Sequence, residues 1–173
     1  MVQANPMKKA VAKVVLLGDM SVGKTTLINK FATGNAGNAS ATIGTDFKTK
    51  QLTVNNTNLT MQIWDTAGQE RYQSLGTAFY RGADCAFLVY DITNTWSFDN
   101  IPNWKNSFLQ KSMVSMPETF PFMVVGNKLD LAEDQRAVER TQAEEFCKRE
   151  GMELIETSAR DNLNVEDAFA LLA

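Results

Sequence analysis

The sequence has 173 residues, 44% of them hydrophobic, with a formal net charge of -3, two cysteines and no histidine. This length and apolar content fit one globular domain, which we expect over residues 10–173 after a flexible N-terminus over residues 1–9. The mild acidity argues against a nucleic-acid partner, and the cysteine and histidine counts argue against structural zinc. No stretch has the apolar length of a membrane span or a signal peptide, so we expect a cytoplasmic protein in which Cys85 and Cys147 are buried, reduced thiols.

A glycine-rich segment lies between the first two predicted elements, a strand over residues 11–17 and a helix over residues 24–32. Residues 18–25 read GDMSVGKT and fit G-x-x-x-x-G-K-[ST], in which backbone N–H groups converge on phosphate oxygens. Lys24 would add a charge at the outer phosphates, and Thr25 a hydroxyl ligand for Mg²⁺. The pattern can arise by chance in a turn, but the flanking strand and helix favour a phosphate-binding loop. The other candidate nucleotide-binding residues here are Asp19, Ser21, Val22, Gly23 and Thr26.

A predicted hairpin, with strands over residues 47–54 and 59–65, leads into a second motif, WDTAGQER at residues 64–71. Asp65, at the end of the second strand, is expected to hold Mg²⁺ through water. The N–H of Gly68 can contact a γ-phosphate, and Gln69 can orient the attacking water. A weaker helix is predicted over residues 70–80.

The third motif is Asn127-Lys128-Leu129-Asp130, directly after a predicted strand over residues 122–126. The Asp130 carboxylate can accept hydrogen bonds from N1 and N2 of guanine, whereas adenine offers one donor on that edge. Asn127 would brace the loop, and the stem of Lys128 can lie over the purine. In isolation the motif could be a solvated turn. Beside a phosphate loop it indicates guanine and argues against an ATP-using P-loop enzyme such as a small kinase.

The remaining predicted elements continue an alternation of strands and helices. This alternation predicts an α/β fold with a mostly parallel sheet, one antiparallel edge strand and helices on both faces. The candidate ligands then fall at the carboxyl ends of strands, where such sheets bind ligands. We expect a strand over residues 85–90, helices over residues 97–111, 141–149 and 165–172, and a strand over residues 153–156.

Several strings of this sequence, in the same order, resemble the Rab branch of the Ras superfamily of small GTPases, whose P-loop fold has six strands. The resemblance covers roughly residues 10–172. The strings are IGTDF at residues 43–47, residues 61–72, FYRGA at residues 79–83 and LVYDIT at residues 88–93. Residues 73–76, 80–85 and 117–122 are most similar to the late-endosomal and lysosomal Rab subgroup.

The resemblance implies a GTP/GDP switch that regulates vesicle traffic and hydrolyses GTP slowly, with activating protein, exchange factor and effectors as partners. Thr42 would meet Mg²⁺ and the γ-phosphate in the triphosphate state only. Rabs usually end in a prenylated tail, and this sequence stops before such a tail. We expect a monomer that this tail attaches to the cytosolic face of late endosomes or lysosomes. The guanine loop would be Ser158, Ala159 and Arg160, and effectors would bind Ile43, Phe47, Trp64 and Phe79, although aromatic residues on strands are often plain core.

Two departures from the family pattern affect the expected kinetics. Residues 34–41 contain no aromatic side chain, with Asn35 and Ala39 where relatives carry Phe and Tyr, so we expect nucleotide to leave several-fold faster. Met20 stands beside the γ-phosphate where relatives have a small residue, and it could crowd Gln69 and slow hydrolysis, or it could point outward without effect. The alternative function is therefore a hydrolysis-impaired or fast-exchanging nucleotide-binding scaffold.

Overall fold

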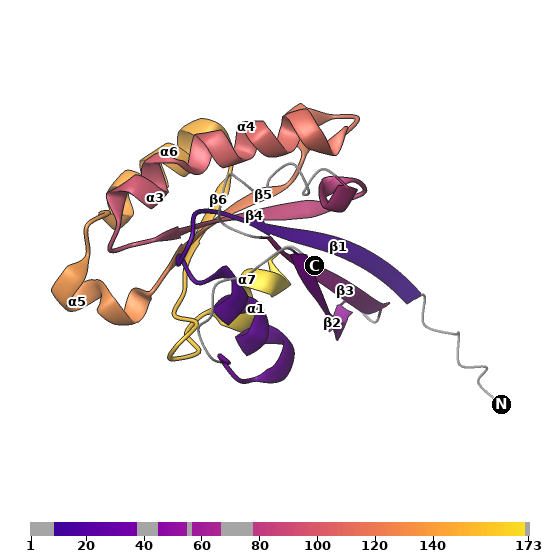
Figure 1. Ribbon diagram of the computed structural model, residues 1–173, viewed down its shortest axis with the longest axis horizontal. Helices are drawn as coiled ribbons and strands as arrows, with labels where there is room; N and C mark the ends of the chain where they lie inside the picture. The colour runs from indigo at the N-terminus through magenta and orange to yellow at the C-terminus, as the bar shows by residue number, and fades with distance from the viewer. Residues whose placement is uncertain (1–8, 38–44, 55–56, 67–77, 172–173) are drawn as a thin grey trace.

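The computed structural model describes residues 9–37, 45–54, 57–66 and 78–171, which form a six-stranded sheet with helices on both faces (Figure 1). The strand order is β2-β3-β1-β4-β5-β6, and every neighbouring pair is parallel except β2 with β3. The predicted α/β class and antiparallel edge strand are confirmed. The strands are β1 (Lys9–Leu17), β2 (Thr45–Val54), β3 (Thr57–Thr66), β4 (Cys85–Asp91), β5 (Phe122–Asn127) and β6 (Glu153–Glu156).

The helices lie in two layers, with α1 and α7 on one face of the sheet and α3, α4 and α6 on the other (Figure 1). Alternate residues of β1 supply the two cores: Val14 and Leu16 pack with α1 and α7, while Val15 and Leu17 pack with α3, α4 and α6. A strand covered on both faces is apolar throughout, which explains the continuous run VVLL. The helices are α1 (Lys24–Thr33), α3 (Thr95–Asp99), α4 (Ile101–Ser112), α5 (Ala132–Gln135), α6 (Arg140–Glu150) and α7 (Val165–Ala170).

The single helix predicted over residues 97–111 is wrong, because the structure has two helices that meet at Asn100. The side chain of Asn94 caps α3 by accepting a hydrogen bond from the N–H of Trp96 at 3.0 Å. Pro102 lies in the first turn of α4, where its missing N–H costs nothing, whereas in a continuous helix its ring would clash with the preceding turn. The chain therefore begins a new helix at Ile101.

Other differences concern short or terminal segments. The sequence did not predict α5 or the 3₁₀ turns Pro117–Thr119 and Leu129–Leu131, which are too short to show a helical period. Of the helix predicted over residues 70–80, only residues 78–80 are described, and they are helical. Among the described residues, no helix combines the length and apolarity that crossing a bilayer requires.

Both cysteines are buried free thiols, as predicted. Burial raises the pKa of Cys85 to about 12 and that of Cys147 to about 11, with neighbouring acidic groups adding to the shift. Neither thiol forms appreciable thiolate at neutral pH, so both act as small apolar core residues.

Candidate nucleotide-binding site

The first motif, residues 64–66 of the second and the third motif lie at the carboxyl ends of β1, β3 and β5, which share one edge of the sheet. The loop after β1 runs from Gly18 to the start of α1 at Lys24. A Cβ on Gly18 would lie 2.2 Å from the carbonyl oxygen of Val89, and one on Gly23 would lie 2.3 Å from Nδ2 of Asn127. Both glycines have positive φ angles of 144° and 96°. Glycine is thus required where the loop touches β4 and the third motif.

Lys24 is buried inside this loop and holds its backbone. Its Nζ donates hydrogen bonds to the carbonyl oxygens of Gly18 at 2.7 Å and Asp19 at 2.8 Å. Desolvation lowers the pKa of Lys24 to about 8, partly offset by the carboxylates of Asp65 and Asp19. A phosphate bound at the loop would favour the charged ammonium, so this lysine is suited to an anionic ligand.

Thr25 and Asp65 bring two hard oxygen donors together at the start of α1 and the end of β3. The Thr25 hydroxyl donates to Oδ2 of Asp65 at 2.5 Å. The Thr66 hydroxyl donates to the carbonyl of Leu16 at 2.6 Å and fastens the end of β3 to β1. A hydroxyl and a carboxylate beside a phosphate loop fit Mg²⁺, which takes few protein ligands and completes its octahedron with water and phosphate oxygens. Among the described residues no cluster of three acidic, histidine or cysteine side chains offers a different kind of metal site.

Asn127, the first residue of the third motif, hydrogen-bonds both to the phosphate loop and to the loop after β6, which fits its predicted bracing role. Its Nδ2 donates to the carbonyl of Val22 at 2.9 Å. Its Oδ1 accepts from the hydroxyl of Thr157 and the N–H of Ala159, each at 3.2 Å. This one buried amide therefore holds together three loops at the ends of β1, β5 and β6.

Asp130 lies beside the loop over residues 158–160, far away in sequence. Its Oδ1 accepts a hydrogen bond from the Ser158 hydroxyl at 2.7 Å, and its Oδ2 lies 3.5 Å from the Arg160 guanidinium. Lys128 has a left-handed backbone, and its Nζ forms a 2.6 Å ion pair with Asp91 at the end of β4. The pairing of Lys128 with Asp91 was not predicted. This ion pair ties the third motif to the end of β4.

The structure places the predicted aromatic group together. The rings of Phe47 and Trp64 stack at 5.0 Å, and those of Trp64 and Phe79 lie 5.6 Å apart. Phe47 is 51% exposed, and Nζ of Lys13 lies 4.5 Å from the Trp64 ring centroid. Trp64 and Phe79 are half-buried, and Trp64 also packs against the core, so the cluster is a partly exposed aromatic surface of the kind more typical of a binding surface than of a core.

Several predicted positions fall elsewhere. Met20 is 51% exposed at the surface of the phosphate loop. Asn35 is exposed, and its N–H donates to the Thr33 hydroxyl at 3.3 Å. Thr42, Ile43, Gly68, Gln69 and Ala39 lie outside the described residues.

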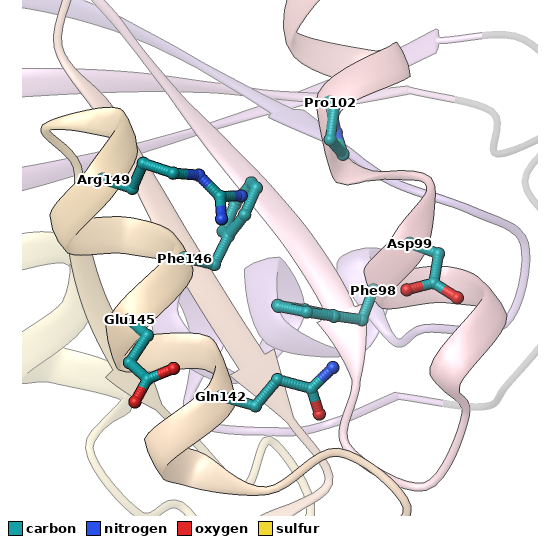
Figure 2. Close-up of a pocket in the computed structure, with 7 residues that line it drawn as sticks. All are labelled: Phe98, Asp99, Pro102, Gln142, Glu145, Phe146 and Arg149. Carbon is teal, nitrogen blue, oxygen red and sulfur yellow. The ribbon is translucent and has the colours of Figure 1, made fainter.

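A separate cavity of about 320 Å³ lies between α6 and the α3–α4 pair. Figure 2 shows Phe146 and Arg149 of α6 on one side and Phe98, Asp99 and Pro102 on the other. None of its lining residues belongs to the three motifs, so this cavity is distinct from the candidate nucleotide site.

The phosphate loop is joined through Asn127 to a guanine-type motif at the edge of this sheet. This combination defines a guanine-nucleotide-binding P-loop protein.

The Ras family model matches residues 13–173. The chain is 49% identical over 168 residues to the Ypt/Rab-type GTPase avaA of Emericella nidulans, covering 96% of this chain and 82% of that protein. It is 51% identical to Ras-related protein Rab7 of Drosophila melanogaster, covering 96% of this chain and 80% of the relative, and 50% identical to YPT7 of Saccharomyces cerevisiae, covering 96% and 81%. The chain therefore belongs to the Ras family, within its Rab branch and the late-endosomal and lysosomal subgroup.

This membership confirms the predicted activity and its class. The protein is a small GTPase that binds GTP and GDP, hydrolyses GTP and acts as a switch in endosomal membrane traffic. Family membership also implies activating proteins, exchange factors and effectors as partners.

Proposed function

We propose that this switch works through the residues assembled at the carboxyl edge of the sheet. Lys24 and the backbone of residues 19–26 bind the phosphates, while Asn127, Lys128, Asp130 and the loop over residues 158–160 bind guanine. The observation that supports this most directly is the buried Asn127 amide, which bonds to the phosphate loop and to the base loop at once. Asn127 would thereby couple phosphate recognition to base recognition.

The catalytic cycle in this proposal depends on Mg²⁺ and on two loops. Thr25 would hold the ion together with Thr42, with Asp65 acting through water, consistent with the contact between the Thr25 hydroxyl and Asp65. When bound, Mg²⁺ neutralises charge between the outer phosphates. Thr42 and Gly68 would contact the γ-phosphate, and Gln69 would orient the attacking water. Loss of the γ-phosphate releases both loops, which changes the surface presented to partners.

Effectors in this proposal bind the GTP state at Ile43 and at the aromatic cluster of Phe47, Trp64 and Phe79. The stacking of these rings and the 51% exposure of Phe47 support such a surface. Residues 10–173 form the GTPase domain in this proposal, and the protein acts as a monomer. A prenylated tail attaches it to the cytosolic face of late endosomes or lysosomes. Relatives named Rab7 and YPT7 support this location.

Release of a fluorescent guanine nucleotide tests the proposal directly. We expect slow release that accelerates when Mg²⁺ is chelated, with no displacement by excess ATP. Because residues 34–41 lack an aromatic side chain, release is expected to be roughly two- to tenfold faster than from a Rab that carries Phe and Tyr in this segment, the rate equivalent of about 0.5–1.5 kcal/mol. Displacement by ATP as effective as by GTP would contradict guanine specificity.

A second possibility, a nucleotide-binding scaffold that hydrolyses GTP poorly, requires the flexible thioether of Met20 to crowd the attacking water, whereas its 51% exposure on the phosphate loop supports the outward orientation. If Met20 crowds the attacking water, Met20→Ser should raise single-turnover GTP hydrolysis several-fold while leaving GDP affinity unchanged. Rapid quench of a preloaded, Mg²⁺-triggered complex measures this rate. Equal rates for the two proteins would show that Met20 does not affect the reaction.

A further inference from the structure

The side chain of Asp19 points away from the interior of the phosphate loop, toward the junction of α3 and α4. Its Oδ1 accepts two hydrogen bonds, from Nδ2 of Asn100 at 2.6 Å and from the indole N–H of Trp104 at 2.7 Å. Both donors are neutral and the acceptor is a carboxylate, so these are the stronger, charge-assisted kind of hydrogen bond. They connect the second residue of the phosphate loop to a helix more than 80 positions further along the chain.

The two donors are themselves held in place. The carbonyl of Asn100 accepts from the backbone N–H groups of Asn103 and Trp104 at 3.1 and 3.2 Å, and its side-chain oxygen accepts from Nδ2 of Asn103 at 2.7 Å. The Trp104 ring is buried in the core beneath α4. Asp19 therefore binds to donors whose positions are fixed by helix packing and by the break between α3 and α4.

The main chain of the same residue contacts Lys24. The Asp19 carbonyl accepts from Nζ of Lys24 at 2.8 Å, so Asp19 joins the helix layer on one side to the phosphate-binding lysine on the other. The neighbouring Gly18 cannot serve as such an anchor, because its backbone lies directly against Val89 and leaves no room for a side chain. Asp19 fastens the first turn of the loop to the α3–α4 junction.

The charge of Asp19 makes this arrangement informative. A carboxylate in a phosphate loop should repel its ligand directly, although the same charge also favours the charged ammonium of Lys24. An aspartate at this position is compatible with an anionic ligand if the geometry that it imposes outweighs the repulsion. The hydrogen bonds from Asn100 and Trp104 direct the carboxylate toward the α3–α4 junction.

We propose that Asp19 is a positioning residue that sets the phosphate-binding geometry of the loop and of Lys24 from the α3–α4 junction, without its side chain touching the nucleotide. The proposal rests on the proposed nucleotide site. In this proposal the carboxylate acts as a hydrogen-bond acceptor for Asn100 and Trp104. The position of that acceptor, more than its charge, then determines how fast nucleotide is released.

The test compares GDP release and thermal unfolding for Asp19→Ala, Asp19→Asn and Trp104→Phe. Because Asp19→Ala removes both hydrogen bonds, it should release GDP about ten- to hundredfold faster. Trp104→Phe removes one and should accelerate release about three- to tenfold, whereas Asp19→Asn keeps an oxygen acceptor and should stay within about threefold of the unchanged protein. The matched control is Phe146→Ala, which loosens the packing of α6 on Phe98 without touching Asp19 and should lower the melting temperature without accelerating release.

The indole N–H proton resonance of Trp104 reports the hydrogen bond independently of nucleotide, and it should shift upfield in Asp19→Ala but not in Asp19→Asn. Unchanged or slower release from Asp19→Ala would overturn the proposal, as would equal acceleration by Asp19→Asn, since charge would then be the relevant property. If the unchanged protein binds guanine nucleotides normally, either of these results contradicts only the proposed role of Asp19. Failure of the unchanged protein to bind guanine nucleotides would instead overturn the proposed site.

Discussion

Asp130→Ala is expected to weaken GDP binding by roughly 10²- to 10⁴-fold and to abolish the preference for guanine over adenine nucleotides. The carboxylate can accept two hydrogen bonds from the guanine edge, and hydrogen bonds to charged groups contribute about 1.5–3 kcal/mol each, or roughly 3–6 kcal/mol together. Without Asp130, two guanine donors and the Ser158 hydroxyl, which now donates to Asp130 at 2.7 Å, lose their acceptor. Competition titrations with GDP and ADP against a fluorescent nucleotide measure both effects.

Asp134→Ala provides the matched control for this experiment. Asp134 is an exposed carboxylate in α5, four residues from Asp130, and it belongs to none of the motifs. Its removal changes the net charge by the same amount, so its GDP affinity should stay within about twofold of the unchanged protein, as for a surface charge. If Asp130→Ala weakened GDP binding no more than Asp134→Ala, Asp130 would not be the residue that reads the base.

The motifs could be predicted from sequence because each one depends on local chemistry. The glycines of residues 18–25 and the order of Asn127 and Asp130 after a strand are constraints within one short segment, and the structure places both segments at the same edge of the sheet. The order of strands and helices followed from periodicity for the same reason. These signals survive without knowledge of what each segment packs against.

The contacts that connect the motifs could not be predicted, because their partners are distant in sequence. Nothing near Asp19 indicates that Asn100 and Trp104 would bind it, and nothing near Lys128 points to Asp91. The break between α3 and α4 could have been found locally, since Pro102 and the cap at Asn94 both signal a new helix start. Side-chain pairs across the sheet edge carry no such signal.

The largest expected effect on stability comes from another such pair, Arg136 and Glu156. The guanidinium donates to both carboxylate oxygens, at 2.7 and 2.9 Å, and also to the carbonyl of Val138 at 3.0 Å. The side chains are only 17% and 4% exposed. Removing Arg136 would leave an unpaired carboxylate buried at the end of β6, directly before Thr157 of the base loop. Breaking a buried pair in this way costs about 3–5 kcal/mol.

Arg136→Ala should therefore lower the melting temperature by roughly 6–20 °C, at about 2–4 °C per kcal/mol for a chain of this size. Arg140→Ala is the exposed comparison, since it breaks a 2.7 Å ion pair with Glu144 whose members are 66% and 50% exposed and interacts with Glu156 only through space, and it should cost at most about 0.5 kcal/mol. Arg136→Met combined with Glu156→Met should recover most of the loss, because no buried charge remains. Differential scanning calorimetry measures the melting temperatures of the unchanged protein and the three variants. Equal decreases in melting temperature for Arg136→Ala and Arg140→Ala would mean that Glu156 is solvated once its partner is gone.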